Sequence, residues 1–228
     1  MGVRRIAVNF VLKRLVNLLC KIDSREFVDA LAKYQPMILA INHINFLEIP
    51  LLVSHGYPHY IAGLAKSETW NNPVFSFIFN TYKAIPIDRN SSFTGAFQKV
   101  RKAIDDNYFV IFAPEGTRSK NGVLSQGKAG LIYLAFEAGI PIMPVVHFGG
   151  QNIWKNMRRF RRTKLKIKTG KPFTIRFEHR PCKEERKIIM DEIMGQIAKL
   201  LPPEMRGIYA DHAEHECKYL EFIPPLKS

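Results

Sequence analysis

PMILAINHINFLEIPLLVSHG, residues 36–56, contains a change from strand to helix that decides the fold and carries the first candidate site. Residues 36–42 are a short apolar run typical of a buried strand, and residues 46–55 are helical in pattern and end before Gly56. His43 is therefore expected at the carboxyl end of a strand, with Glu48 in the first turn of a helix. Five residues of continuous helix turn about 500°, so the two side chains can meet only because the chain bends between them.

A histidine held by a carboxylate is the arrangement that turns a neutral alcohol into a nucleophile. The imidazole accepts the alcohol's proton, while the carboxylate fixes the ring tautomer and stabilises the imidazolium. The strings GxSxG and CGxC are absent, which favours direct transfer over a covalent acyl-enzyme. For the pair alone there is an alternative, in which Glu48 complements a helix N-terminus and His43 simply ends the strand.

A second segment, APEGTRS at residues 113–119, follows the apolar run YFVIF and also falls at the carboxyl end of a predicted strand. Ligands bind at such strand ends in open α/β sheets. Gly116 allows the backbone to turn close to a ligand, Thr117 offers a hydroxyl, and Arg118 offers a planar fork suited to phosphate. By itself PEGTR is compatible with a surface turn, but together with NHxxxxE it is far more specific.

These segments resemble the motifs of the glycerophospholipid acyltransferase family, of the lysophosphatidate acyltransferase or PlsC type, over residues 36–171. The family's NHxSxxD block is similar to residues 42–48, with Asn45 in place of serine and Glu48 in place of aspartate. FPEGTRS is similar to residues 113–119, with Ala113 in place of phenylalanine. A strand ending in Asp-Arg resembles KAIPIDRN, which contains Asp88 and Arg89, and an apolar strand with an internal proline resembles IPIMPVVHFG, which contains Pro144.

The resemblance implies a role for each matching residue. His43 would be the general base and Glu48 its catalytic partner, while Arg89 and Arg118 would hold the acceptor's phosphate. The residues implied in substrate binding are Asn42, Arg89, Glu115, Gly116, Thr117, Arg118 and Lys128. For Lys128 the alternative is a solvated charge at a helix end, and for Arg89 it is an ion pair with Asp88 or a distant carboxylate. The extra methylene of Glu48 requires an adjusted backbone or a looser pair.

The implied reaction moves a fatty acyl group from acyl-CoA or acyl carrier protein to the free hydroxyl of a lysophospholipid. The most favoured acceptor is 1-acylglycerol 3-phosphate, whose acylation yields phosphatidate in phospholipid biosynthesis. No metal or redox cofactor is expected. The alternatives are an acyltransferase acting on glycerol 3-phosphate or another lipid alcohol, and a catalytically weak lipid-binding protein on the same scaffold.

Length and patterning predict one α/β domain. The chain has 228 residues and 46% hydrophobic content, with no Ser- or Gly-rich linker, repeat or low-complexity tract. Strand-like runs alternate with helical stretches at residues 93–106 and 129–139, which indicates a mixed, largely parallel sheet flanked by helices. The strand-like runs are MILAIN, YIAGLA, AIPI, YFVIFA, IPIMPVV and LKIK.

The cysteines and the C-terminal histidines do not indicate a disulfide framework or a metal site. Cys20, Cys182 and Cys217 are odd in number and widely spaced, as expected for free thiols in a reducing compartment. His212, His215 and Cys217 occur in DHAEHECKY, whose spacing matches no common zinc pattern.

Positive charge is concentrated in one part of the chain. The formal net charge is +14, and nine lysines and arginines lie between Trp154 and Lys171, in a stretch without acidic residues. An anionic membrane surface, an acyl carrier protein or the phosphates of coenzyme A fit such a segment, and the alternative is a solvated strand edge. Nucleic acid is not expected, because no nucleic-acid motif accompanies the charge.

The N-terminal segment predicts membrane attachment. Lys13 and Arg14 interrupt the apolar run, which is therefore shorter than the roughly 20 residues that span a bilayer. At 100° per residue one face carries the apolar side chains Val8, Val11, Leu12, Leu15 and Leu19. Residues 1–22 are thus expected to form an amphipathic helix on the cytoplasmic face of a membrane, as in a peripheral or monotopic protein, with the acyltransferase domain in residues 23–228. The alternatives are a helix packed on the domain's own core and, less well matched for want of a cleavage site, a signal peptide.

Overall fold

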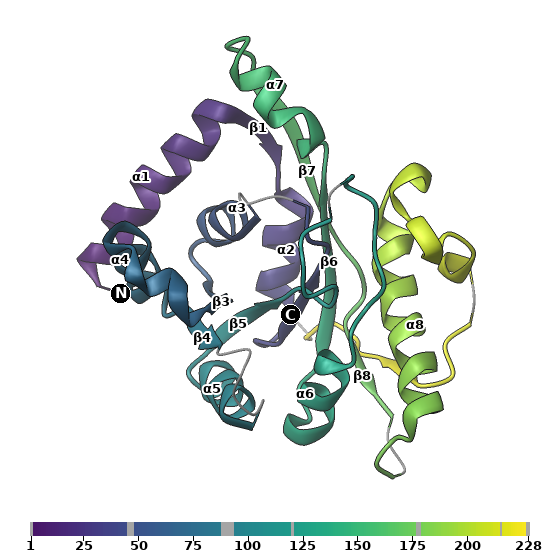
Figure 1. The fold of residues 1–228 in the computed structure, drawn as a ribbon. Coiled ribbons are helices and arrows are strands. Elements are labelled where there is room, and N and C mark those ends of the chain that lie inside the picture. The colour runs from purple at the N-terminus through teal and green to yellow at the C-terminus, as the bar shows by residue number, and fades with distance from the viewer. Residues whose placement is uncertain are drawn as a thin grey trace.

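The computed structural model describes residues 2–44, 48–87, 94–119, 121–176, 179–214 and 216–226, and the strands in these ranges form one sheet. The central order is β1-β7-β6-β2-β5-β3-β4, and β8 and β9 extend the sheet from β6 (Figure 1). The strands are β1 Cys20–Asp23, β2 Ile38–Ile41, β3 Tyr60–Lys66, β4 Ile85–Ile87, β5 Tyr108–Phe112, β6 Ile142–Phe148, β7 Thr163–Thr169, β8 Phe173–Ile175 and β9 Leu220–Phe222.

The sheet is mixed and mostly parallel, as the sequence predicts. β2 runs parallel to both neighbours, with Ile38 opposite Val110 of β5 and Ile142 of β6, and β3 runs parallel to β4 and β5. β7 is antiparallel to β6, while β8 is antiparallel to β6 and β9. Because β2, β5 and β6 point the same way, their carboxyl ends meet at one edge, which is where both predicted motifs begin.

Helices cover both faces of the sheet (Figure 1). The α-helices are α1 Val3–Leu19, α2 Arg25–Lys33, α3 Glu48–His55, α4 Pro73–Tyr82, α5 Thr94–Asp105, α6 Gly130–Ala138, α7 Ile153–Met157 and α8 Lys183–Leu200. Short 3₁₀ turns lie at Ser67–Asn71, Gly150–Asn152, Pro203–Met205, Gly207–Tyr209 and Asp211–Glu214. One core lies between the sheet and α5, α6 and α8, and the other contains side chains of α1 to α4. The alternation of side chains along each strand feeds both cores, as in a sheet covered on both faces.

The strand-like runs of the sequence all form strands of this sheet, and the two predicted helical stretches form α5 and α6. β1, β8 and β9 were not predicted, nor were the helices α2, α4, α7 and α8. The expected boundary at residue 22 falls inside β1, because Cys20 to Asp23 pair with β7 residues Thr163 to Lys166. The chain thus passes from α1 into the sheet without a linker.

The predicted apolar face of α1 is only partly covered by the domain. Val8, Leu12 and Leu19 pack against the core, whereas Val11 and Leu15 are exposed. The exposed apolar side chains of α1 are Val3, Ile6, Phe10, Val11, Leu15 and Leu18.

The inward side of α1 is in part polar. The guanidinium of Arg5 lies 4.3 Å from the ring centre of Tyr60 and donates to the Tyr108 hydroxyl at 3.2 Å. The Tyr82 hydroxyl donates to Oδ1 of Asn9 at 3.0 Å. The helix is therefore attached to the domain by polar as well as apolar contacts and turns apolar side chains outward. Among the described residues, no helix has both the length and the hydropathy that crossing a bilayer requires.

Candidate active site

His43 and Glu48 form a hydrogen-bonded pair at the carboxyl end of β2. Nδ1 of His43 lies 2.5 Å from Oε2 of Glu48, which confirms the predicted contact. Glu48 is the first residue of α3 in the described chain, so the bend between strand and helix brings the two side chains together. The His43 side chain is 29% exposed and the Glu48 side chain 1%, so the carboxylate is enclosed while the imidazole reaches the surface.

The surroundings of Glu48 keep its carboxylate ionised. Burial raises its pKa, but contacts with His147 and His43 oppose this effect and bring the pKa from an ordinary 4.5 to about 2. Its Oε1 also accepts a short hydrogen bond from the backbone N–H of Ile44. An ionised carboxylate only accepts hydrogen bonds, so Nδ1 of His43 carries the proton that it donates. Nε2 of neutral His43 is then the free base.

The two sequence motifs are joined directly. The backbone N–H of His43 donates to Oε1 of Glu115 at 2.8 Å, and the N–H of Ser119 donates to the carbonyl of His43 at 2.7 Å. Oε2 of Glu115 accepts from both the N–H and the hydroxyl of Ser125, at 2.9 and 2.6 Å. Glu115 is buried, so it holds the base against the PEGTR turn and does not face a ligand with a free carboxylate.

Lys128 packs against the PEGTR turn. Gly116 has φ +68°, a conformation that suits glycine, and a Cβ at this position would lie 3.2 Å from Nζ of Lys128. The N–H of Lys128 donates to the carbonyl of Pro114 at 2.9 Å. Thr117 and Arg118 are exposed, with Arg118 next to the residue that binds the His43 carbonyl. The turn that is hydrogen-bonded to the His43 backbone therefore carries the exposed Arg118 and has the Lys128 side chain against Gly116.

The Asn42 amide, for which the resemblance implies a role in substrate binding, is hydrogen-bonded within the protein. Its Nδ2 donates to the carbonyl of His147 and its Oδ1 accepts from the N–H of His147, both at 3.0 Å. The residue is buried, so its amide ties β2 to β6 and is not available to a ligand. Asn45, Asp88 and Arg89 lie outside the described residues, so the expected phosphate contact of Arg89 stays a prediction.

His147 is a site residue that the sequence reasoning missed. It lies on β6, one residue before the strand ends, and its Nε2 is 3.1 Å from Oε1 of Glu48. The signal was available in IMPVVHF, where alternation points this histidine toward the core although every other side chain of the strand is apolar.

No group of three or more histidine, cysteine, aspartate or glutamate side chains in the described residues is arranged to hold a metal ion.

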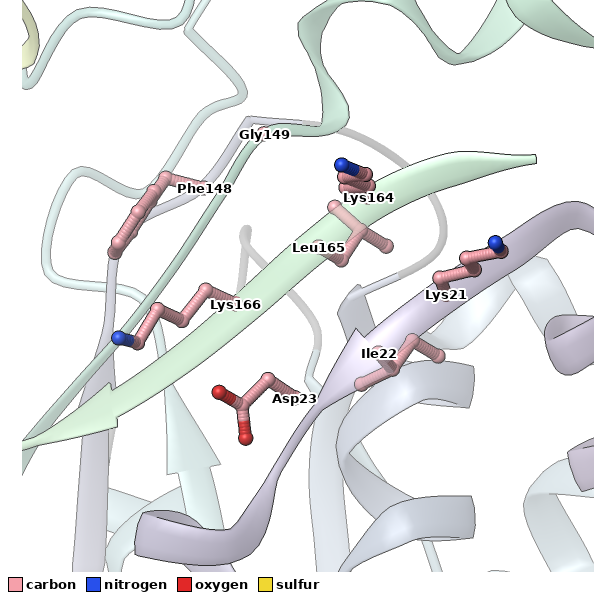
Figure 2. A pocket seen from close by; sticks show the side chains of 8 residues that line it. All are labelled: Lys21, Ile22, Asp23, Phe148, Gly149, Lys164, Leu165 and Lys166. Carbon is pink, nitrogen blue, oxygen red and sulfur yellow. The ribbon is translucent and has the colours of Figure 1, made fainter. Parts of the chain in front are cut away.

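A groove of about 470 Å³ lies at the β1 and β7 side of the sheet and is not lined by His43 or Glu48. Figure 2 shows Phe148, Ile22 and Leu165 with the three lysines Lys21, Lys164 and Lys166 around them. Asp23 also borders this groove. It is adjacent in sequence to the active-site edge, because Phe148 follows His147, but it is separate from the His43 site.

Comparisons with known proteins agree with this geometry. The family model described as Acyltransferase matches residues 24–147. A 1-acyl-sn-glycerol-3-phosphate acyltransferase from Cocos nucifera is 31% identical over 156 residues, which are 66% of this chain and 48% of that protein. One from Bacillus subtilis is 26% identical over 165 residues, which are 72% of this chain and 80% of that protein. The chain thus spans about half of the coconut relative.

A solved structure shows the same fold. The 1-acyl-sn-glycerophosphate acyltransferase PlsC from Thermotoga maritima matches with a TM-score of 0.57 and 20% identity, over 83% of this chain and 76% of that one. The family match contains His43, Glu48 and the PEGTR turn and covers more than half of the 228 residues. This chain therefore belongs to the acyltransferase family.

Proposed function

We propose that the protein transfers a fatty acyl group from a thioester to the free hydroxyl of 1-acylglycerol 3-phosphate, forming phosphatidate for phospholipid biosynthesis. The observation that carries the proposal is the His43–Glu48 pair, hydrogen-bonded to the same turn that presents Arg118 and Lys128. Relatives named for this activity support the choice of acceptor.

The proposed chemistry follows from the tautomer of His43. Its Nε2 removes the proton of the acceptor hydroxyl as that oxygen attacks the thioester carbonyl, while Glu48 stabilises the imidazolium. The new C–O bond forms, the C–S bond breaks, and the imidazolium returns its proton to the leaving thiolate. The products are an ester and a free thiol, and the enzyme's own groups end in their starting protonation state.

The acceptor's phosphate would be held by the cations of the PEGTR turn. Arg118 is exposed and offers a bidentate fork, and Lys128 lies against Gly116 in the same turn. A glycerol hydroxyl lies only a few bonds from the phosphate, so the phosphate site has to be next to the base. The Ser119–His43 hydrogen bond provides that proximity.

The donor is proposed to be acyl-CoA or acyl carrier protein, both of which are strongly anionic. Lys21, Lys164 and Lys166 of the groove in Figure 2, with the arginines that follow α7, provide complementary charge on the β7 side. Such charge mainly raises association rates and is weakened by salt.

We further propose that the protein binds a membrane surface peripherally, through the outward faces of α1 and α4. Exposed apolar residues of α1 continue onto α4, which packs beside it, where Val74, Phe75 and Phe77 are exposed (Figure 1). The guanidinium of Arg4 lies 5.9 Å from the ring centre of Phe77 and connects the two helices. An exposed apolar surface of this kind on adjacent helices is typical of an interaction site.

The segment after α7 is a second exposed surface, and it is both basic and aromatic. Phe160 is 99% exposed, and the arginines around it are Arg158, Arg159, Arg161 and Arg162. Trp154 and Met157 of α7 are also exposed. Aromatic side chains among arginines suit the interface of an anionic bilayer, in which the rings enter the headgroup layer while the charges meet phosphates.

The test is a substrate panel with the purified protein. Thiol release and lipid product are measured with acyl-CoA or acyl carrier protein as donor, and with lysophosphatidate, glycerol 3-phosphate or a neutral lysolipid as acceptor. We expect turnover with lysophosphatidate, lost in His43→Ala. If the protein preferred another alcohol, that alcohol would replace lysophosphatidate as the assigned acceptor. Lipid binding without turnover in the intact protein would instead indicate a binding protein.

A further inference from the structure

His147 contacts the carboxylate oxygen of Glu48 that His43 does not contact. Its side chain is 1% exposed, and its Nε2 lies 3.1 Å from Oε1 of Glu48, while His43 contacts Oε2. The carboxylate is therefore placed between two imidazoles, one that reaches the surface and one that is enclosed in the domain. Nothing in the proposed reaction, which uses His43 and Glu48, accounts for the second ring.

The backbone of His147 is held by hydrogen bonds from a side chain as well as by strand pairing. Asn42, the residue before His43, makes two hydrogen bonds with the N–H and carbonyl of His147, both at 3.0 Å. β6 is paired with β2 on one side and with β7 on the other, where His147 is opposite Ile167. The position of the second imidazole is thus set by the same segment that carries the first one.

The ring of His147 has no other polar use among the residues that the structure describes. Both its nitrogens are buried without a regular hydrogen bond, because the contact with Glu48 is close in distance but not well aligned. A buried polar ring without hydrogen bonds is costly, and a leucine would fill this core position without that cost. Catalytic hydrogen bonds are often misaligned in the free enzyme and become aligned when substrate binds.

We propose that His147 is a positioning residue that holds the Glu48 carboxylate toward His43, and that it thereby lets a glutamate serve as the partner of the base. The longer arm of glutamate has one more rotatable bond than aspartate. Ile44 and His147 hold one carboxylate oxygen, which leaves the other in the direction of His43. Because Glu48 only accepts hydrogen bonds, His147 has to present its Nε2–H tautomer. This inference rests on the proposed acyl transfer for its kinetic consequence but not for its structural one.

The kinetic test compares two replacements in the full chain. His147→Leu removes the N–H and keeps apolar bulk, whereas His147→Gln places an amide N–H near the position of Nε2. We expect His147→Leu to lower kcat by about tenfold with KM within about twofold, the loss that follows from removing one hydrogen bond to a charged group, and His147→Gln to restore most of it. Equal kcat values for the leucine and wild-type proteins, or equal losses in both variants, would overturn the proposal. Thermal unfolding of each variant separates a folding defect from this effect.

A double-mutant cycle tests whether the role is specific to glutamate. Glu48→Asp shortens the arm, so the carboxylate cannot contact both histidines. In that background the loss caused by His147→Leu should shrink from about tenfold to less than about threefold, because the contact is already broken. The same fold loss in both backgrounds would show that His147 acts only through the core.

A measurement that needs no activity completes the test. In protein with ¹⁵N-labelled histidine, NMR should show His147 as the neutral Nε2–H tautomer, with signals that change in Glu48→Gln. An Nδ1–H tautomer would direct a lone pair at the carboxylate and would overturn the inference. If the wild-type protein shows this tautomer but no acyl transfer with any acceptor, the proposed function fails while the contact stands.

Discussion

Oε2 of Glu48 lies 2.5 Å from Nδ1 of His43 even though a glutamate side chain is one methylene longer than an aspartate side chain. The extra length is accommodated at the start of α3, where the other carboxylate oxygen turns back to the N–H of Ile44 and meets Nε2 of His147. His43 and Glu48 lie close together because both carboxylate oxygens of Glu48 have contacts that fix their positions. The looser pair considered for glutamate from the sequence is not what the structure shows.

The acceptor phosphate and the anionic surface partner should respond to different arginines. Arg118→Ala should remove the preference for a phosphate-bearing acceptor, by roughly ten- to a hundredfold, because it deletes a charge-assisted hydrogen bond beside the base. Competition between lysophosphatidate and a neutral lysolipid measures this preference. It should be lost at every salt concentration.

The matched variant changes Arg158, Arg159 and Arg161 together to glutamine. It should weaken binding to anionic vesicles in a salt-dependent way, because salt screens exposed charges over about 8 Å at physiological ionic strength. Arg162 is left in place, since it donates to the carbonyl of Cys20 at 2.8 Å and supports β1. If the triple variant lost acceptor preference while Arg118→Ala kept it, the phosphate site would not be in the PEGTR turn.

Membrane binding should depend on the outward face of α1. Replacing Phe10 and Leu18, which are 60% and 70% exposed, by serine should weaken sedimentation with vesicles while leaving the unfolding temperature almost unchanged. Ile188→Ser provides the control, because this residue is 47% exposed on α8, across the sheet from α1 (Figure 1). Equal loss in the control, or no loss in the double variant, would exclude α1 as the attachment surface.

Because His55 is buried, we expect the free energy of unfolding to fall in mild acid. Burial lowers its pKa from 6.5 to about 4, opposed by a hydrogen bond with the Leu51 carbonyl and assisted by the charge of Lys13. Between these two values the unfolded chain binds a proton that the folded chain does not, so stability is present above pH 6.5 and is lost as the pH falls toward 4. The expected contribution is about 3 kcal/mol, from roughly 1.4 kcal/mol for each pKa unit.

Urea unfolding at pH 7 and pH 4 checks this value. His55→Gln retains a polar group near Oδ1 of Asn17, which lies 3.2 Å from Nε2 of His55, but cannot titrate. Its stability should decline less than that of the wild type over this interval. Parallel curves for His55→Gln and the wild type would show that His55 does not cause the decline.

Much of the sheet could be predicted because its central strands are continuous apolar runs, as in IPIMPVV and YFVIF. β1 was missed because the CKID stretch is short and charged, and it becomes a strand only by pairing with β7. β8 and β9 have three residues each, and a polar residue, Thr174 or Glu221, stands in the middle of each, so they lack the apolar run that marks the equally short β4. Tertiary pairing, which local sequence does not contain, determines these elements.

The candidate site was predictable where side chains follow buried strands. His43 and Glu115 lie just after β2 and β5, and parallel pairing of these strands joins them. The role of Asn42 could not be predicted, because its partner is a backbone group 105 residues away. The division of the α1 residues between covered and exposed positions could not be predicted, because helical periodicity shows which residues share a side but not which side the domain covers.

The most direct test of the account is the kinetic effect of Glu48→Gln on acyl transfer to lysophosphatidate. The amide keeps the size of the side chain but cannot stabilise an imidazolium, so kcat should fall on the order of a hundredfold or more while KM changes little. Steady-state rates at saturating donor provide both values. A raised KM with unchanged kcat would mean that Glu48 contributes only to binding, and it would contradict the assignment of His43 and Glu48 as the catalytic pair.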